Sequence, residues 1–323
     1  SAMICRLRLW IELLKNMYYK DSKFTELETL PNIDINIKAG NSLVYRFDFT
    51  DSYSKLPAST QQKLKLATQK YKDQVIIYKS THDKATKKQA ERNIAELKET
   101  FSQIANPTDK DYKKLKAAEA KLGEMPMLFS KEEQEAWKKK TEQLAEEVKE
   151  LKAKYDLKLK TLYGKGFEWR FEFPEVLDED GNFIGFDVII GNPPYFSLSK
   201  DPNNSYYAGQ YETFNTAGDI YCLFYELGVK IIAPNRYLSN ITSNKWMRAT
   251  YGQQLRHYFN IHTQPFYLFD FSWYQVFENA NVDTNILSLS KHSEEWNMVG
   301  AVAGKDFKIE NLADYSNENT IPL

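Results

Sequence analysis

The fold of this chain is decided by the stretch Phe186-Asp187-Val188-Ile189-Ile190-Gly191-Asn192-Pro193-Pro194-Tyr195. Its first half is a nearly continuous apolar run, which predicts a strand that is buried on both faces of a parallel sheet covered by helices. Pro193 and Pro194 fix their own φ angles and donate no backbone hydrogen bond, so we expect the strand to end at this corner. The carbonyl oxygens of Asn192 and Pro193 should then leave the ladder and accept hydrogen bonds from elsewhere.

These groups suit a flat heterocycle that carries an amino group, such as adenine. Asn192 offers an amide oxygen, Pro193 a carbonyl oxygen and Tyr195 a ring for stacking. After an apolar strand, Asn192-Pro193-Pro194-Tyr195 resembles motif IV of the adenine-N6 DNA methyltransferases, above all the large bacterial restriction-modification and phage-defence enzymes of the type IIG kind. The alternative is a proline-rich strand end that only turns the chain.

The resemblance implies a catalytic role for this corner. The amino group of adenine is a poor nucleophile because its lone pair is conjugated with the ring. The Asn192 side chain and the Pro193 carbonyl would accept its two hydrogens and turn the lone pair toward the methyl group of S-adenosylmethionine. Most of the rate would come from positioning and preorganised electrostatics, so no general base is expected.

The resemblance also implies that the target adenine leaves the duplex and is held between two rings. Tyr195 would cover one face of the base. Phe277, within residues 276–286, stands where motif VIII of the family supplies the second ring. Packing in the protein core is the alternative role for Phe277.

Other segments resemble further motifs of the family more loosely, and they follow its order along the chain. Gly40-Asn41-Ser42-Leu43 resembles motif III, with Asn41 in place of the acidic residue that commonly contacts the adenine of the cofactor. By resemblance, Asn41 and Asn192 are therefore the candidate cofactor-binding residues. Residues 218–221 resemble motif V, where Asp219 is expected to cap the following helix, and residues 239–248 resemble motifs VI and VII.

The sequence shows no glycine-rich cofactor loop in the place that the family requires. That loop should precede the helix expected to begin at Ile4, and neither residues 164–166 nor residues 299–304 have its context. The target-recognition domain expected after motif VIII is also absent. We therefore expect a fragment of a larger enzyme, which by itself is inactive and does not bind S-adenosylmethionine, or binds it only weakly.

Three domains are expected from the changes in composition along the chain. Residues 1–54 would form the N-terminal part of a methyltransferase domain, with a buried helix marked by Ile4, Leu7, Ile11 and Leu14 and a strand over Ile33–Lys38. Residues 55–163 are rich in Lys, Glu, Ala and Gln and predict two long helices with a shorter one between them, folded into an antiparallel, coiled-coil-like hairpin. Residues 164–323 would hold the catalytic part.

Strands alternate with helices in this last part, which indicates an α/β fold with a sheet covered on both sides. A helix is predicted over 220–231, a strand over 237–242, a helix over 246–259 and strands over 267–271 and 284–290. The expected fold is thus a partial Rossmann-like methyltransferase sheet that carries a long helical insertion.

The helical insertion is basic. Between Lys55 and Lys165 the sequence has 26 Lys and Arg against 17 Asp and Glu, a net charge of +9, whereas the whole chain carries −1. Charge runs on helices are usually solvent-facing, so a solvated spacer is favoured over direct contact with DNA. Duplex DNA as a partner of the parent enzyme is therefore expected from the site and not from the net charge.

The remaining composition indicates a cytoplasmic protein without metal. Cys5 and Cys222 both lie in apolar helical patterns and are expected to be buried reduced thiols. The four His and two Cys residues show no metal-ligand spacing. No apolar run is long enough to span a bilayer and no signal peptide is visible.

Two other functions remain open beside DNA adenine methylation. A methyltransferase acting on a protein glutamine amide would use the same motif, because that amide presents the same NH₂ geometry. Alternatively, residues 59–162 are a coiled-coil interaction module on an inactive α/β base. Also open are the DNA sequence recognised, the oligomeric state and whether the parent enzyme cleaves DNA as well.

Overall fold

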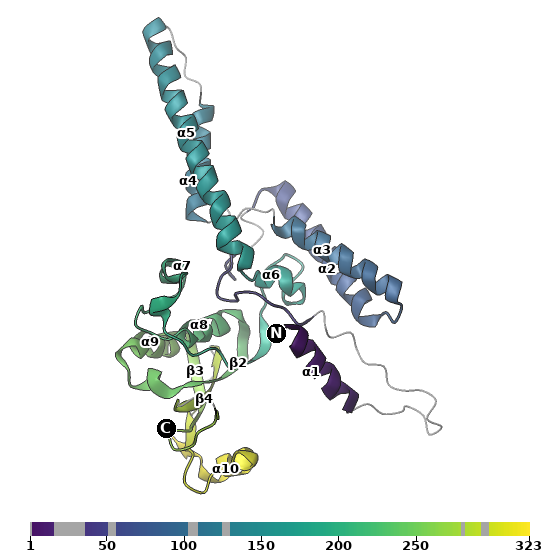
Figure 1. The fold of residues 1–323 in the computed structure, drawn as a ribbon, viewed down its shortest axis with the longest axis vertical. Coiled ribbons are helices and arrows are strands. Elements are labelled where there is room, and N and C mark those ends of the chain that lie inside the picture. Colours follow the sequence, from purple (N-terminus) through teal and green to yellow (C-terminus); the bar gives the residue numbers. More distant parts are fainter. Residues whose placement is uncertain are drawn as a thin grey trace. The chain divides into compact units, whose positions relative to one another are not determined.

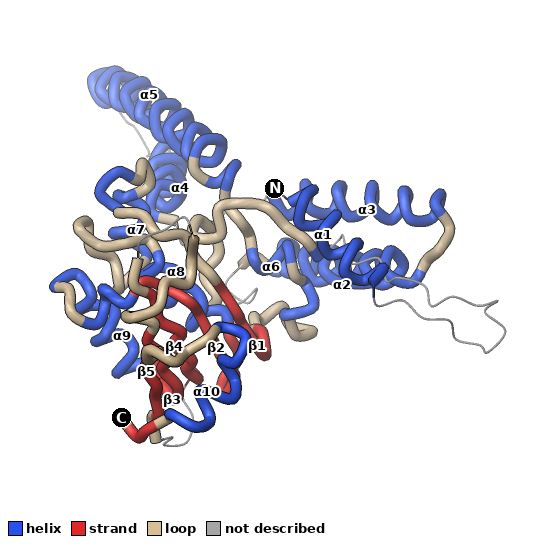
Figure 2. Tube along the Cα trace, turned by 60° about the horizontal axis from the view of Figure 1, so that its bottom comes forward, coloured by secondary structure: helices blue, strands red, loops and turns tan. Residues whose placement is uncertain are grey.

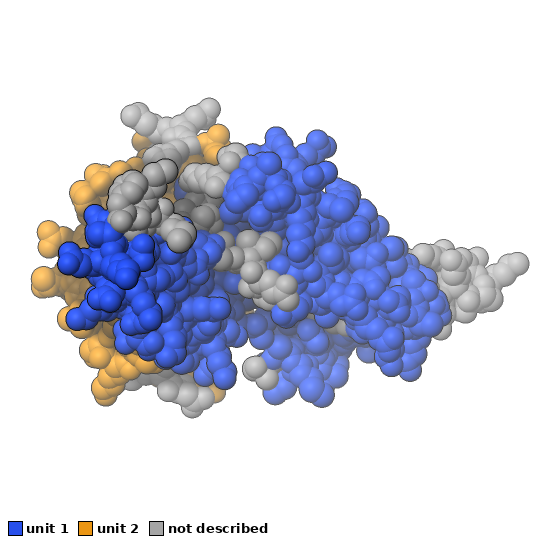
Figure 3. All heavy atoms as spheres, turned by 90° about the horizontal axis from the view of Figure 1, so that it is seen from above, with its two compact units in different colours: residues 1–183 blue, residues 184–323 orange. Residues whose placement is uncertain are grey.

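The computed structural model describes residues 2–15, 36–50, 56–102, 109–124, 130–278, 282–291 and 297–323. The chain divides into two compact units, Ser1–Phe183 and Ile184–Leu323, which Figure 3 colours separately. The domain boundaries that we inferred from composition, after residues 54 and 163, differ from this division and stay predictions.

Unit 1 is helical in its described residues. Its helices pack as two pairs, α2 against α3 and α4 against α5, each of which folds back on itself (Figure 1). The α-helices of this unit are α1 (Ala2–Lys15), α2 (Ala58–Ser80), α3 (Lys84–Ser102), α4 (Lys110–Gly123), α5 (Lys131–Thr161) and the short α6 (Trp169–Glu172).

The sequence predicted three helices in this insertion, and its described residues form four, α2 to α5. The break that the prediction missed lies between Ser80 and Lys84, where no Gly or Pro marks it. The Asp83 carboxylate accepts hydrogen bonds from the backbone N–H and the hydroxyl of Thr86, so it satisfies the first turn of α3.

Aromatic packing joins the α2–α3 pair to the segments on either side of the insertion. The Phe101 ring on α3 stacks on Phe171 of α6, with centroids 4.4 Å apart, and Phe47 meets Phe171 edge-on. Leu64 and Ala67 of α2 complete this buried cluster. The insertion is therefore packed onto the segments that flank it.

A buried ionic cluster holds the base of the α4–α5 pair. The Asp109 carboxylate caps α4 by accepting from the N–H groups of Asp111 and Tyr112, and it also accepts from Lys158 at 2.7 Å and from the Tyr163 hydroxyl at 3.0 Å. Lys158 bonds Asp111 as well, at 2.9 Å. Burial opposes the ionised form of Asp109, but these bonds, led by the one from Lys158, hold its pKa below the usual value.

Three predictions about the N-terminal region are corrected. The helix α1 forms as expected, but it has no buried residue, and Ile4, Leu7, Ile11 and Leu14 are all exposed. Cys5 is exposed on it, whereas Cys222 is buried as predicted. The strand predicted over Ile33–Lys38 lies partly outside the described residues, and its described part, residues 36–38, is not a strand.

Unit 2 is built on one mixed sheet of six strands in the order β1-β2-β4-β3-β5-β6 (Figure 2). β1 runs parallel to β2 and β3 parallel to β5, while the β2–β4, β4–β3 and β5–β6 pairs are antiparallel. The strands are β1 (Phe186–Gly191), β2 (Ile232–Ser243), β3 (Thr263–Asp270), β4 (Thr284–Lys291), β5 (Val299–Val302) and β6 (Ile321–Pro322). The mixed α/β fold is thus confirmed.

Helices cover one face of the sheet. α8 (Tyr221–Ile231) and α9 (Gln253–His262) pack against Ile189, Leu238, Leu268 and Leu287 of four neighbouring strands. On the opposite face a second cluster centres on Phe269 and Phe307 and includes Tyr315 of α10 (Leu312–Asn319). The other helix of this unit is α7 (Asn204–Gln210). The two predicted helices are present, although the second begins with two 3₁₀ turns.

The prediction that β1 is buried on both faces is wrong for this structure. β1 forms the edge of the described sheet, and Val188 and Ile190, on the face opposite α8 and α9, are 56% and 82% exposed. Only Ile189 among its central residues packs against the core. The apolar run correctly predicted a strand, but its second apolar face is not covered by described residues of unit 2.

Candidate functional site

Asn192 directly follows the carboxyl end of strand β1. The pairing of β1 with β2 ends at Gly191, which lies opposite Asn240, and the Asn-Pro-Pro-Tyr corner follows at once. Gly191 is required here because a Cβ at this position would collide with the Asn240 side chain, which is buried. The side chain of Asn192 is exposed beyond this contact, and Pro193 is buried behind it.

The Tyr195 hydroxyl connects the corner to the neighbouring strand. Its oxygen lies 3.0 Å from the Asn192 Oδ1 and 3.0 Å from the carbonyl oxygen of Ile241 on β2. Burial raises the pKa of Tyr195 to about 12, so the hydroxyl keeps its proton at neutral pH and acts as a donor. It carries only one proton, which either acceptor can take.

The structure brings Phe277 beside Tyr195, although 82 positions separate them in the sequence. Their ring centroids are 6.2 Å apart and the planes are tilted by 63°. Phe277 follows β3 in the loop that leads to β4, and it is partly exposed, in contrast to the fully buried Phe269 and Phe271 nearby. The two predicted stacking residues therefore share one place in unit 2.

The Tyr195 ring contacts Tyr221, which starts a hydrogen-bonded chain that continues to Tyr251 and Asp219. The buried Tyr221 ring meets Tyr195 edge-on at 6.1 Å, its hydroxyl lies 2.9 Å from that of Tyr251, and Tyr251 donates to the Asp219 Oδ2 at 3.0 Å. Burial raises the pKa of both Tyr221 and Tyr251, so both hydroxyls stay protonated. The motif V resemblance covered Tyr221, but nothing in the sequence pointed to Tyr251.

The expected helix-capping role of Asp219 is not observed. The residue at the N-cap of α8 is Ile220, with no side-chain cap, and the Asp219 carboxylate accepts from Tyr251 instead. Asp219 is thus part of the support for the aromatic site because α8 starts one residue later than the pattern predicted.

Asn41 lies in unit 1, so the structure does not place it relative to Asn192. The side-chain oxygen of Asn41 accepts from the Leu43 N–H at 3.2 Å, and its own N–H donates to the Lys165 carbonyl.

The residues that the structure describes contain no group of three or more His, Cys, Asp and Glu side chains that could hold a metal ion. Among their helices, none is both long and apolar enough to cross a membrane.

A family model decides the relationship of this chain to known proteins. The model of the Eco57I restriction-modification methylases matches residues 1–277, which is most of the 323-residue sequence. The chain belongs to the Eco57I restriction-modification methylase family. The match includes the helical insertion, Asn41, the Asn-Pro-Pro-Tyr corner and Phe277.

Curated relatives of this Eco57I-family chain are restriction-modification proteins. The type II restriction enzyme and methyltransferase RM.Eco57I of Escherichia coli is 30% identical over 115 residues, which cover 34% of this chain and 12% of the relative. The type II methyltransferase M.XhoI of Xanthomonas vasicola is 33% identical over 73 residues, which cover 22% of this chain and 13% of the relative. The chain thus matches only about an eighth of the length of these relatives.

Among solved structures, the type IIG restriction endonuclease BpuSI is 17% identical to the Eco57I-family chain, with a TM-score of 0.31, over 41% of this chain and 18% of that one. The type IIL restriction-modification enzyme MmeI in complex with DNA is 15% identical, with a TM-score of 0.31, over 45% of this chain and 22% of that one. Scores of this size carry no argument about function.

Proposed function

We propose that the protein carrying this chain transfers a methyl group from S-adenosylmethionine to N6 of an adenine extruded from duplex DNA, within a restriction-modification or phage-defence system. The observation that carries the proposal is the shared position of three groups in unit 2. The Asn192 amide, the Tyr195 ring and the Phe277 ring come from two loops at one edge of the sheet.

Each of these groups has a task in the proposed reaction. The Asn192 side chain and the Pro193 carbonyl accept the two hydrogens of the amino group, which orients its lone pair. Tyr195 and Phe277 hold the two faces of the base, and each stacked face recovers about 1–3 kcal/mol of the cost of unstacking. Pro194 keeps the corner rigid between the acceptor groups and the Tyr195 ring.

S-Adenosylmethionine supplies the electrophilic methyl group when it is bound. Asn41 and Asn192 are the residues of this chain that we propose as its contacts, since the side-chain oxygen of Asn41 is a hydrogen-bond acceptor of the kind that the adenine amine of the cofactor requires. That the 323 residues alone are inactive and bind the cofactor weakly or not at all stays a prediction.

The test uses the full-length protein that carries this chain and a radiolabelled methyl donor. Unmethylated DNA is offered in parallel with a glutamine-containing peptide, and the labelled DNA is digested to nucleosides. We expect label in the DNA only, as N6-methyladenine. Label on cytosine would contradict the assignment of the base, and label on the peptide would favour the glutamine-amide alternative.

A further inference from the structure

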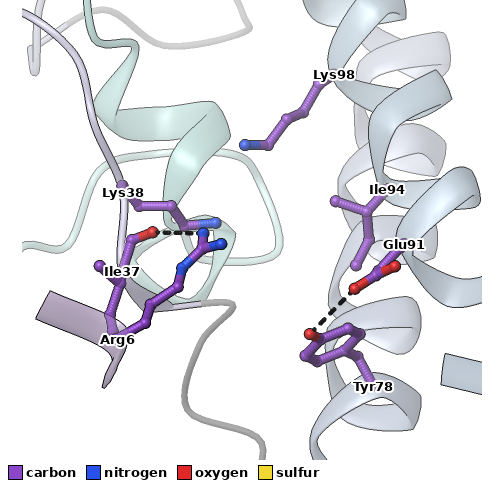
Figure 4. A pocket seen from close by; sticks show the side chains of 7 residues that line it. All are labelled: Arg6, Ile37, Lys38, Tyr78, Glu91, Ile94 and Lys98. Atoms are coloured by element: carbon purple, nitrogen blue, oxygen red, sulfur yellow. Dashed lines mark hydrogen bonds between the residues drawn. The ribbon is translucent and has the colours of Figure 1, made fainter. Parts of the chain in front are cut away.

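A cavity of about 190 Å³ lies within unit 1, and none of its lining residues has a role assigned above (Figure 4). It is bordered by α1, by the segment that precedes Asn41 and by the α2–α3 pair. Its volume is below the range of about 300–1,000 Å³ that drug-sized ligands occupy, so it suits a small group. The lining residues are Arg6, Ile37, Lys38, Tyr78, Glu91, Ile94 and Lys98.

Three cationic side chains from three separate elements reach this cavity. Figure 4 shows Lys98 extending from α3 toward the segment of Lys38, where the Arg6 guanidinium of α1 lies beside the Lys38 side chain. The Arg6 guanidinium donates to a neutral group, the Ile37 carbonyl, at 3.2 Å. Like charges at such a point repel one another unless anions offset them.

The described carboxylates offset only part of this charge. Glu172 forms ion pairs with both lysines: its Oε2 lies 2.6 Å from the Lys98 Nζ and 3.5 Å from the Lys38 Nζ. Glu91, on the opposite wall, accepts from the Tyr78 hydroxyl at 3.2 Å. Glu175 also favours the charged form of Lys38, and it pairs with Lys79 at 3.4 Å. Counting Arg6, Lys38, Lys79 and Lys98 against Glu91, Glu172 and Glu175, one positive charge remains in excess among these described groups.

Burial makes this excess costly. The Lys38 side chain is only 12% exposed. Burial, followed by repulsion from Lys98, lowers the pKa of Lys38, and Glu172 opposes that change. A poorly solvated ammonium with an incomplete countercharge is stabilised by any anion that enters beside it.

We propose that this cavity binds a phosphate group, held by Arg6, Lys38 and Lys98. Lysine offers three donors and the arginine fork matches phosphate oxygens, so together they suit a tetrahedral anion. Such a site gives the basic insertion a role in phosphate binding in addition to its predicted role as a spacer. Lys98 lies on the insertion and Lys38 lies three residues before Asn41, so the bound phosphate joins the insertion to the motif III segment.

The test measures binding of inorganic phosphate to the 323-residue chain by calorimetry, with chloride holding the ionic strength constant. We expect saturable binding, weakened about tenfold or more by Lys98→Gln, as for loss of a charged hydrogen bond. The matched control is Lys116→Gln on α4, which also breaks a lysine–glutamate pair but lies outside the cavity lining. It should leave the affinity for phosphate unchanged.

A second variant guards against a purely structural effect of Lys98→Gln. Glu91→Gln removes a negative charge from the cavity wall, so it should tighten phosphate binding about two- to fivefold, within the range of exposed charge pairs. A role of Glu91 confined to folding predicts no such gain. Absence of saturable phosphate binding, or the same affinity in all three variants, would overturn the proposal.

The source of the phosphate is settled by competition. If a short DNA duplex displaces inorganic phosphate, the site takes a backbone phosphate of nucleic acid. If phosphate binds and the duplex does not compete, the ligand is a free or small-molecule phosphate. No methyl donor enters these measurements, so their failure is distinct from failure of the proposed methyl transfer.

Discussion

Replacing Gly191 by alanine should damage the site while leaving the rest of unit 2 folded. The added Cβ would come well within 3.0 Å of the Asn240 Oδ1, a separation that real Cβ atoms essentially never show. Asn240 is buried on the neighbouring strand and cannot swing into solvent. Either this side chain or the end of β1 must therefore move.

The expected cost follows from the packing around that contact. Inserting one methyl group into a well-packed place costs about 1–3 kcal/mol. If the end of β1 moves instead, Asn192 moves with it, and a displacement of about 1 Å at a reacting group costs roughly 10²-fold in rate. We expect Gly191→Ala both to lower the stability of unit 2 and to slow methyl transfer.

The assay has a stability arm and an activity arm. Hydrogen exchange of the segments containing β1 and β2 reports local opening in the chain, and methyl transfer is measured in the full-length protein. Gly209→Ala on α7 is the control because a Cβ there meets nothing within 4 Å. Alanine in place of that glycine should be neutral or stabilise the helix by up to about 1 kcal/mol.

Relief of the collision gives the sharpest check. The double substitution Gly191→Ala with Asn240→Ala should recover stability, with a coupling of about 0.5–3 kcal/mol. Unchanged exchange and unchanged turnover in Gly191→Ala would refute the reasoning. So would additive effects in the double variant, because they would show that the two side chains do not meet.

Four further outcomes are expected. Asn192→Ala should abolish turnover but largely retain DNA binding by the full-length protein, since the lost interaction acts mainly in the transition state; a parallel loss of DNA affinity would contradict this. Phe277→Ala should weaken binding to a duplex more than to DNA with the target position unpaired, and equal losses would leave Phe277 as a core residue. Tyr195→Phe should keep turnover within about tenfold, measured as methyl transfer, because the hydroxyl gives up its bond to Asn192 when the base binds and its other bond, to the Ile241 carbonyl, does not involve the base. Asp109→Asn should lower the thermal midpoint of unfolding at pH 7. In the original chain the ionised Asp109 stabilises the fold above about pH 4, and this stabilisation is lost as the pH falls through the lowered pKa. The variant has no carboxyl group at position 109, so its midpoint should not show this part of the acid dependence.

Local chemistry was enough to predict much of unit 2. The apolar run before Asn192, the periodicity over 220–231 and the strands near 237 and 284 all appear in the structure. Their signals lie in consecutive residues. The order of the strands could not be predicted in the same way, because it depends on pairings such as Tyr237 with Ser290, which are distant in sequence.

Burial was the least predictable property. Ile4, Leu7 and Ile190 have the apolar spacing of core positions, yet all three are exposed in the structure. Periodicity shows which face of an element is apolar, but it cannot show what covers that face. Asp83 illustrates a second limit, because its role in starting α3 comes from a local hydrogen bond and not from a helix-breaking residue.

The contacts around Tyr195 could not be predicted from the sequence, because they join residues that are distant along the chain. Tyr251 and Asp219 are 32 positions apart and meet only because α8 and the 3₁₀ turn at Thr250–Gly252 are folded together. Sequence could mark Asn192, Tyr195 and Phe277, whose motifs are compact. It could not show that the Tyr195 ring meets the buried Tyr221 ring edge-on, or that the Tyr221 hydroxyl is bonded to Tyr251.

Under the proposed function, the two acceptors of the Tyr195 hydroxyl explain how the site can exist before a base enters it. Without a base, the Tyr195 hydroxyl lies 3.0 Å from the exposed Asn192 Oδ1 and can donate a hydrogen bond to it. When an adenine amine takes that oxygen, the hydroxyl proton can turn to the Ile241 carbonyl at the same distance, so no half-buried donor loses its partner. The rings need a larger change, because a base stacks face to face on each aromatic ring. Their planes are tilted by 63° with centroids 6.2 Å apart, so at least one ring must rotate before a base can lie flat between parallel faces. Tyr195 is held by its hydroxyl and by the Tyr221 ring, so we expect Phe277 to be the ring that moves.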